Sequence, residues 1–199
     1  MLEFVIASIV IELTPGPNMT WLAVLGATRG RGPALIAVAG VCLGLALAGL
    51  VAGLGLTVLF VTFPSLLTAL RYAGTLYLLY LAYAAWVDTQ APPEVQGRKT
   101  SSYFMQGFVS NALNPKAYLF YAAILPQFLS AANATREIVL LTSIYVAVAT
   151  TIHFLIALAS GSLANWLAHA PHANTLRRAM ALAIAAAAVW FFISTGQMK

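Results

Sequence analysis

Three ionisable side chains, Glu12, Lys116 and His153, lie within long apolar stretches of this sequence. An ionisable group inside a bilayer is costly, and it usually faces a cavity, pairs with another polar group and serves a transport path. A lysine can bind a carboxylate, a glutamate can bind an ammonium group or a proton, and a histidine titrates near neutral pH. These residue types therefore favour a buried site that binds a zwitterion and exchanges protons.

Glu12 and Lys116 each adjoin a short cluster of helix-breaking residues. The first cluster runs from Thr14 to Asn18 (TPGPN), and the second runs from Asn111 to Lys116 (NALNPK). Proline removes a backbone donor and glycine permits unusual backbone angles, so each cluster predicts an interrupted helix. Irregular backbone at membrane depth is tolerated only where it is buried in protein or lines a cavity. Matched interruptions in the two halves of a chain therefore predict a substrate site near the bilayer midplane.

Each interruption should begin a new helix with a proline in its first turn. We expect Thr14 and Asn114 to be the N-caps and the carbonyl of Asn111 to be freed. The unpaired N–H groups of a helix start favour a carboxylate. The expected ion-coupling residues are Glu12 and His153. The expected substrate-binding residues are Thr14, Pro15, Gly16, Pro17, Asn18, Asn111, Asn114, Pro115 and Lys116.

Each of these residues also has a structural interpretation. Glu12 and Lys116 are equally compatible with a salt bridge, which is the usual way to tolerate charges inside a membrane. His153 is compatible with a hydrogen-bonded interior histidine, the more common situation. The two breaks are compatible with kinks whose backbone groups are satisfied by neighbouring helices.

The composition places these residues in an all-α integral membrane protein. The 199 residues are 61% hydrophobic and only 8% charged, and no Asp, Glu, Lys or Arg lies between Arg31 and Arg71 or between Glu137 and Arg177. A membrane-spanning helix needs only about 20 apolar residues. The net charge of +5 comes from basic residues at the ends of apolar runs, which indicates membrane topology rather than nucleic-acid binding. No motif for a nucleotide, a metal or another cofactor is present in the sequence.

Six hydrophobic segments can be distinguished, and they form two similar halves. We predict six transmembrane helices as two inverted three-helix repeats, with the first and fourth helices broken. The repeats are residues 1–87 and 103–199, joined by a cytoplasmic linker at 88–102. Small residues at Gly40, Gly44 and Ala48 predict close helix packing in the second segment. The six segments are Phe4 to Thr28, Pro33 to Phe63, Ser65 to Val87, Tyr103 to Leu129, Ile138 to Ala168 and Leu176 to Ser194.

The basic residues of the short loops predict the orientation. One side carries Arg29, Arg31, Arg98, Lys99, Arg177 and Arg178, and the other carries Arg71, Arg136 and Lys199. The richer side should be cytoplasmic. Both termini are then expected outside.

The paired motifs resemble the LysE/RhtB family of amino-acid exporters, and the resemblance extends over essentially the whole chain. It implies export of amino acids or close derivatives from the bacterial cytoplasm by secondary transport, and a multi-pass protein of the inner membrane. Family members often carry an acidic residue in the fifth segment, where this chain has Thr150 to His153. The residues that carry the resemblance are TPGPN at 14–18, NPKA at 114–117, Leu119-Phe120, LPQF at 125–128, Arg71 to Gly74, Tyr77-Leu78 and Gly107.

A small neutral amino acid is the expected cargo, because the spans offer few further charges to pair with a charged substrate. The expected partners are this substrate, the lipid bilayer and a second copy of the chain in a homodimer, with no nucleic acid. The alternative is an exporter of metal or other cations, which would need clustered His, Asp or Glu in the spans. An enzyme would need a nucleophile with its base, and neither Ser110 nor Ser143 has such a partner by motif.

Overall fold

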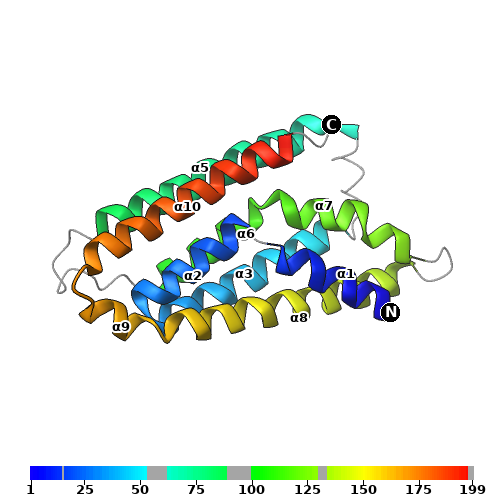
Figure 1. The fold of residues 1–199 in the computed structure, drawn as a ribbon. Helices are drawn as coiled ribbons and strands as arrows, with labels where there is room; N and C mark the ends of the chain where they lie inside the picture. The colour runs from blue at the N-terminus through cyan, green and yellow to red at the C-terminus, as the bar shows by residue number, and fades with distance from the viewer. Residues whose placement is uncertain (15, 53–61, 89–99, 130–133, 197–199) are drawn as a thin grey trace.

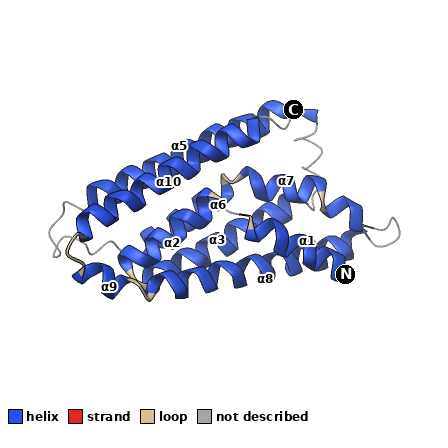
Figure 2. Cartoon of the chain, viewed as in Figure 1, coloured by secondary structure: helices blue, strands red, loops and turns tan. Residues whose placement is uncertain are grey.

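The computed structural model describes the chain except residues 15, 53–61, 89–99, 130–133 and 197–199. Every regular element among the described residues is helical (Figure 2), which confirms the all-α prediction. In chain order the elements are α1 (Leu2–Leu13), α2 (Pro17–Arg29), α3 (Arg31–Val51), α5 (Pro64–Asp88), α6 (Thr100–Ala112), α7 (Pro115–Ala123), the 3-10 helix η3 (Leu125–Phe128), α8 (Ala134–Gly161), α9 (Ala164–His169) and α10 (Ala173–Gly196).

The helices run along the long direction of the molecule (Figure 1). Helices α1 and α2 follow one another along this direction, as do α6 and α7. Helix α3 packs against α6 and α8, and α8 also packs against α1 and α2. Helices α5 and α10 pair along one side, and the two ends of the chain lie toward the same end of the molecule. The interrupted helices are thus held between the continuous ones.

The first interruption corrects one sequence-based prediction. Thr14 ends α1 instead of capping α2: its φ and ψ are −64° and 117°, and its hydroxyl donates to the Val10 carbonyl at 3.0 Å. Gly16 is the N-cap of α2, with Pro17 in the first turn and no side-chain capping bond. A threonine hydroxyl can bond back to the fourth preceding carbonyl, and here this local bond prevails over capping.

The second interruption follows the prediction more closely. Asn114 is the N-cap of α7, and its Oδ1 accepts a hydrogen bond from the Lys116 backbone N–H at 3.1 Å. Pro115 occupies the first turn, where a missing donor costs nothing. The Asn111 carbonyl is not free, however, because it accepts from the Asn114 N–H at 2.9 Å. The turn therefore satisfies the one group that the proline was expected to release.

Two hydrophobic clusters lie on either side of the interruptions. One is built around Trp21 and Leu22 of α2 and Ile184 of α10, and the other around Phe4 of α1 and Tyr145 of α8. The buried polar side chains belong to neither cluster. These side chains are Ser8, Glu12, Asn18, Ser110, Asn111 and His153.

Glycines bring α3 and α6 into backbone contact. A Cβ atom added at Gly40 would clash with the Phe104 carbonyl, and one added at Gly107 would clash with the Ala37 carbonyl. At Gly44 the added atom would meet the Phe108 carbonyl at 2.9 Å. The close approach predicted from the small-residue spacing is confirmed.

Arginine–aromatic contacts link α5 and α10 near both of their ends. The Arg71 Cζ atom lies 4.4 Å from the ring centroid of Phe192, and the Arg178 Cζ atom lies 5.3 Å from that of Trp86. Each contact joins a guanidinium of one helix to an aromatic ring of the other. Cation–π attraction of this kind adds to the apolar packing of the pair.

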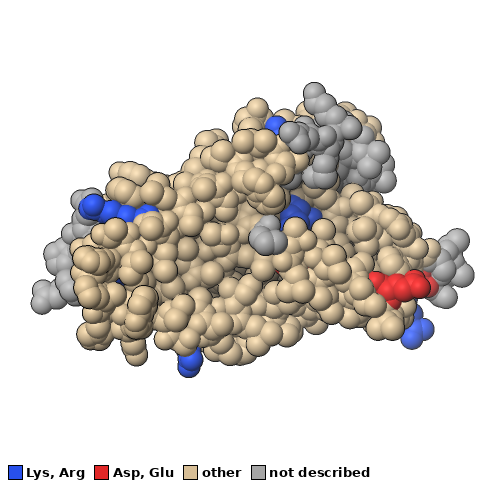
Figure 3. Space-filling view, in the orientation of Figure 1, with Lys and Arg blue, Asp and Glu red and all other residues tan. Residues whose placement is uncertain are grey.

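The outer surface is that of a membrane protein. Three helical stretches of the described chain are long and apolar enough to cross a membrane: Arg31–Val51, Thr135–His169 and Ala173–Ser194. Large apolar side chains such as Leu50, Leu182 and Trp190 are more than half exposed. In the visible face, acidic side chains gather near one end, whereas basic side chains show near both ends, at the upper and lower edges and at one place near the middle (Figure 3). The arrangement of six spans as an inverted repeat stays a prediction.

Candidate functional site

A small cavity lies where the two interrupted helices meet. The space open to water inside it is about 20 Å³, enough for about one water molecule. The break at the start of α2, the break between α6 and α7, and the helices α1, α3, α8 and α10 all contribute to its wall. The lining residues are Glu12, Gly16, Pro17, Asn18, Met19, Leu45, Asn111, Asn114, Lys116, Ala117, Tyr145, His153 and Phe191.

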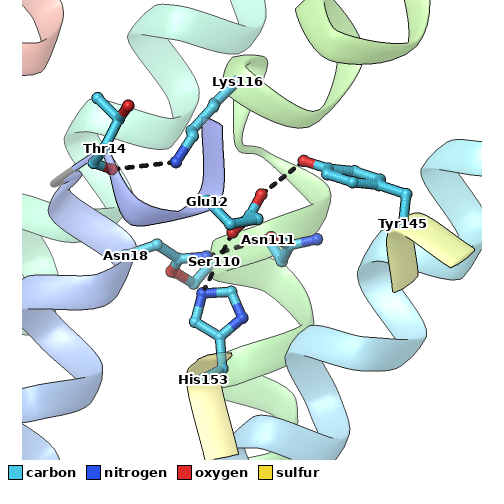
Figure 4. Close-up of polar contacts among 8 residues, drawn as sticks. All are labelled: Glu12, Thr14, Asn18, Ser110, Asn111, Lys116, Tyr145 and His153. Carbon is cyan, nitrogen blue, oxygen red and sulfur yellow. Dashed lines mark hydrogen bonds and ion pairs between the residues drawn. The ribbon is translucent and has the colours of Figure 1, made fainter. Parts of the chain in front are cut away.

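Glu12 brings a buried carboxylate to this cavity from the last turn of α1. The Tyr145 hydroxyl donates to its Oε1 at 2.6 Å, and the His153 Nε2 lies 3.9 Å from its Oε2 (Figure 4). Tyr145 and His153 are eight residues apart on α8, so they lie on one face of that helix. A carboxylate with these neighbours can hold a proton or a cationic group.

Lys116 joins the two interruptions directly. Its Nζ donates to the backbone carbonyl of Thr14 at 3.2 Å (Figure 4). The carbonyl comes from the end of α1 and the lysine from the start of α7, so the bond closes the gap between them. The ammonium group bonds to this carbonyl and not to Glu12, whose carboxylate faces Tyr145 and His153 instead. The salt bridge considered from the sequence is therefore not formed in this conformation.

Two asparagines and a serine connect α2 to α6 beside the cavity. The Asn18 Nδ2 donates to the Asn111 Oδ1 at 3.2 Å, and the Ser110 hydroxyl donates to the Asn18 Oδ1 (Figure 4). All three side chains are buried. The Asn111 Nδ2 has no hydrogen-bond partner within the described structure.

The predicted site residues converge. Six of them line the cavity with Glu12 and His153, namely Gly16, Pro17, Asn18, Asn111, Asn114 and Lys116. Thr14 contributes its carbonyl to Lys116, and Pro115 is buried in the first turn of α7. Pro15 lies outside the described residues. These positions could be predicted from the sequence because helix breakers and intramembrane charges are conspicuous in an apolar chain.

Tyr145 and Ser110 are site residues that the sequence analysis did not identify. Tyr145 is fully buried, and its ring stacks on Phe120 with centroids 3.8 Å apart. A signal was available on α8, since Tyr145, Ala149 and His153 recur every four residues. The signal was weak, because tyrosines and serines are common in membrane helices and neither residue adjoins a proline.

The arrangement offers opposite charges and several oriented dipoles around one small space. Lys116, the amide of Asn111 and the first N–H groups of α2 are donors, whereas Glu12 is an acceptor. Within the described part of the chain, no three His, Cys, Asp or Glu side chains come together as a metal site. The site is therefore suited to hold a small molecule that carries both an anionic and a cationic group.

The chain is similar to known translocator and efflux proteins. The family model of LysE type translocators matches residues 9–195. The leucine efflux protein of Klebsiella pneumoniae is 30% identical over 132 residues, which cover 64% of this chain and 62% of that protein. The leucine efflux protein of an Enterobacter strain is 30% identical over 146 residues, covering 70% of this chain and 69% of that protein. The membrane protein YrhP of Bacillus subtilis is 33% identical over 118 residues, 53% of this chain and 56% of its own.

These matches leave part of each relative uncovered. The match spans less than two thirds of the Klebsiella and Bacillus proteins. No solved structure matches the chain significantly.

Proposed function

Because the chain belongs to the family of LysE type translocators, we propose that it exports a neutral amino acid across the bacterial inner membrane by secondary transport. Two of its relatives are leucine efflux proteins, which supports leucine or a similar apolar amino acid as the cargo. The observation that carries the proposal is the cavity at which both helix interruptions, the buried carboxylate of Glu12 and the half-buried ammonium group of Lys116 meet.

The charges around the cavity support a zwitterionic substrate. Glu12 and Lys116 are the lining residues with a full charge of opposite sign, and His153 is titratable. In this proposal Lys116 and the residues of the two breaks bind the carboxylate. Glu12 binds the ammonium group or the coupling proton, and His153 exchanges that proton. A second full charge on the substrate would find no further partner in the wall, which favours a neutral side chain.

The size of the cavity supports a mechanism in which the helices move. An amino acid cannot enter a space that holds about one water molecule. At the edge of this space the Lys116 ammonium group bonds the Thr14 carbonyl, and we propose that this bond opens when a substrate binds the lysine. We propose that the structure represents a closed state, and that substrate binding replaces this bond with one to its carboxylate.

The packing of the helices supports two related halves. Helix α1 lies on α8, as α6 lies on α3, and α5 lies on α10. If α1, α3 and α5 correspond to α6, α8 and α10, the α1–α8 contact corresponds to the α6–α3 contact and the α5–α10 contact corresponds to itself. This is expected of an inverted repeat. We propose that residues 1–87 and 103–199 are the two repeats, with both termini outside. Most of the linker at 88–102 lies outside the described residues.

Proteoliposomes test the proposal. Vesicles containing the purified chain would be loaded with radiolabelled leucine, lysine or glutamate, or with manganese ions, and efflux would be followed with and without a proton gradient. We expect leucine to leave fastest and the gradient to change its rate, whereas empty vesicles should retain it. Efflux of manganese without efflux of any amino acid would support the cation alternative and contradict the proposal. Leucine efflux at a rate that does not depend on the proton gradient would contradict the proposed proton coupling, but not the proposed export of leucine.

A further inference from the structure

The hydrogen bonds that connect Ser110, Asn18 and Asn111 form a polar chain, and this chain has a direction from donor to acceptor. An asparagine side chain has one oxygen acceptor and one nitrogen donor, and a serine hydroxyl can act as either. Here Asn18 presents its oxygen to Ser110, and the Ser110 hydroxyl donates to it. The Asn18 nitrogen must then point the other way, and it donates to the Asn111 oxygen. The Asn111 nitrogen is left at the far end of the chain.

This last nitrogen is a buried donor without a partner. Asn111 is 2% exposed, its Nδ2 has no hydrogen bond in the described structure, and the residue lines the cavity. A buried polar group without a partner is costly, so a ligand that accepts its hydrogen bond gains affinity. Asn111 is also closely packed, because a Cβ atom on Gly44 of α3 would meet the Asn111 Cβ at 3.2 Å. The start of the Asn111 side chain is therefore held against α3.

We propose that the Asn111 side-chain amide donates to the carboxylate of the transported amino acid, and that Ser110, acting through Asn18, keeps this nitrogen turned toward the cavity. The inference rests on the proposed function and assigns a specificity role within it. Asn111 is the substrate-binding group, and Ser110 is a positioning residue. The first N–H groups of α2, beside Asn18, add a partial positive charge to the same wall.

Reversing the direction of the chain would reverse the preference. If the Ser110 hydroxyl accepted a hydrogen bond, Asn18 would offer its nitrogen to Ser110 and its oxygen to Asn111. Asn111 would then offer an oxygen to the cavity, which suits an ammonium group. The direction of the chain thus decides which end of a zwitterion binds at Asn111.

Competition in proteoliposomes tests this directly. The probes are leucine, and leucinamide, which keeps the amine and lacks the carboxylate. We expect leucine to compete against radiolabelled leucine efflux at least about tenfold better than leucinamide in the wild-type chain, because a hydrogen bond to a charged group typically changes affinity by that factor. Asn111→Asp, which replaces the donor by an acceptor of similar size, should remove or reverse this preference.

Ser110→Ala and Ser110→Thr separate positioning from packing. Ser110→Ala should lower the preference for leucine over leucinamide several-fold, because Asn18 and Asn111 can then turn over together. Ser110→Thr restores the hydroxyl and should restore the preference. Ser143→Ala is the matched control, since its hydroxyl bonds the Val139 carbonyl on an exposed face of α8. If Asn111→Asp does not fold, the two Ser110 variants carry the test.

The outcomes are distinguishable. A wild-type chain that moves no amino acid overturns the proposed function and the inference together. A chain that moves leucine while Asn111→Asp and Ser110→Ala keep the wild-type preference overturns only the inference. Loss of preference in Ser110→Ala with recovery in Ser110→Thr supports it, because a purely structural role would change the rate or the yield without changing the preference.

Discussion

The two helices that precede the interruptions bury residues at the same spacing and differ in their last buried residue. Helix α1 ends at Leu13 and α6 ends at Ala112, and each presents buried residues at intervals of four. In matching order these residues are Phe4, Ser8 and Glu12 on α1, and Tyr103, Gly107 and Asn111 on α6. The next-to-last residue of the helix is thus Glu12, an acceptor, in α1 and Asn111, an amide with an unpaired donor, in α6. Two related helix ends can therefore address the opposite ends of a zwitterion.

The surfaces against which these helices pack differ as well. Helix α1 meets Tyr145 and His153 of α8 through polar side chains. Helix α6 meets Gly40 and Gly44 of α3 through the backbone. A contact between backbones is fixed by shape, whereas a contact between a carboxylate, a phenol and an imidazole changes when a proton or a substrate arrives. We therefore propose that ion coupling takes place at the α1–α8 contact, with the α3–α6 contact as its fixed counterpart.

The largest expected effect is on transport when the charge of Glu12 is removed. Glu12→Gln keeps the shape and can still accept from Tyr145, but it cannot bind an ammonium group or carry a proton. We expect leucine efflux from proteoliposomes to fall by about 100-fold or more, in the range that loss of a buried charge partner produces. Thermal unfolding in detergent should change little, because a buried charge is itself costly.

Glu3→Gln is the matched control for that experiment. Glu3 lies in the first turn of the same helix and is exposed. Its efflux should equal that of the wild type. If Glu12→Gln kept wild-type efflux, the proton and the ammonium group would have to bind elsewhere. The two helix ends would then not differ in function as described.

The next effect compares the equivalent positions Gly107 and Ser8. Gly107→Ala forces a methyl group into the Ala37 carbonyl, and overpacking of this kind costs about 1–3 kcal/mol. Ser8→Ala removes a hydroxyl that bonds the Phe4 carbonyl of its own helix at 2.8 Å, and should cost less than about 1 kcal/mol. Thermal unfolding in detergent measures both. Equal losses at the two positions would contradict the view that only the α3–α6 contact is fixed by shape.

A smaller effect is expected when Glu12 loses its hydroxyl partner. Tyr145→Phe keeps the ring that stacks on Phe120 and removes the 2.6 Å bond to the carboxylate. A hydrogen bond to a charged group is worth about 1.5–3 kcal/mol, but the buried carboxylate retains His153 nearby. We expect efflux to fall several-fold, well short of the loss in Glu12→Gln. Tyr83→Phe, at an exposed position of α5, should leave efflux unchanged. A loss as large as that of Glu12→Gln would mean that Tyr145 itself takes part in transport.

The same comparison explains what the sequence could reveal. Both interruptions were predictable, because prolines and glycines inside apolar segments leave few alternatives. Glu12 and Lys116 were conspicuous as charges, and their approach to one cavity was expected from the matched halves. The N-cap at Thr14 was wrong because a local hydroxyl–carbonyl bond and a cap use the same side chain, and sequence does not decide between them.

The polar partners were harder to predict because they depend on side chains from distant helices. The bonds from Tyr145 to Glu12 and from Ser110 to Asn18 connect residues 133 and 92 positions apart. No local pattern specifies such a pair. The Asn111 carbonyl was predicted to be free, yet the turn that ends α6 already satisfies it. The unpaired group is the side-chain nitrogen, which only the direction of the hydrogen bonds could identify.

The smallest effect concerns the α5–α10 pair, where the two halves are most alike. Arg71 lies 4.4 Å from the Phe192 ring and is partly buried, whereas Arg178 lies 5.3 Å from the Trp86 ring and is exposed. Cation–π attraction is worth about 0.5–1 kcal/mol at exposed sites and more where water is excluded. We expect Arg71→Gln to lower the unfolding temperature by a few degrees, Arg178→Gln by less, and the exposed control Arg136→Gln by nothing measurable. A larger effect of Arg178→Gln would contradict this expectation, because distance and burial would then not determine the strength of these contacts. The two ends of the helix pair would be alike only in the types of residue that meet there.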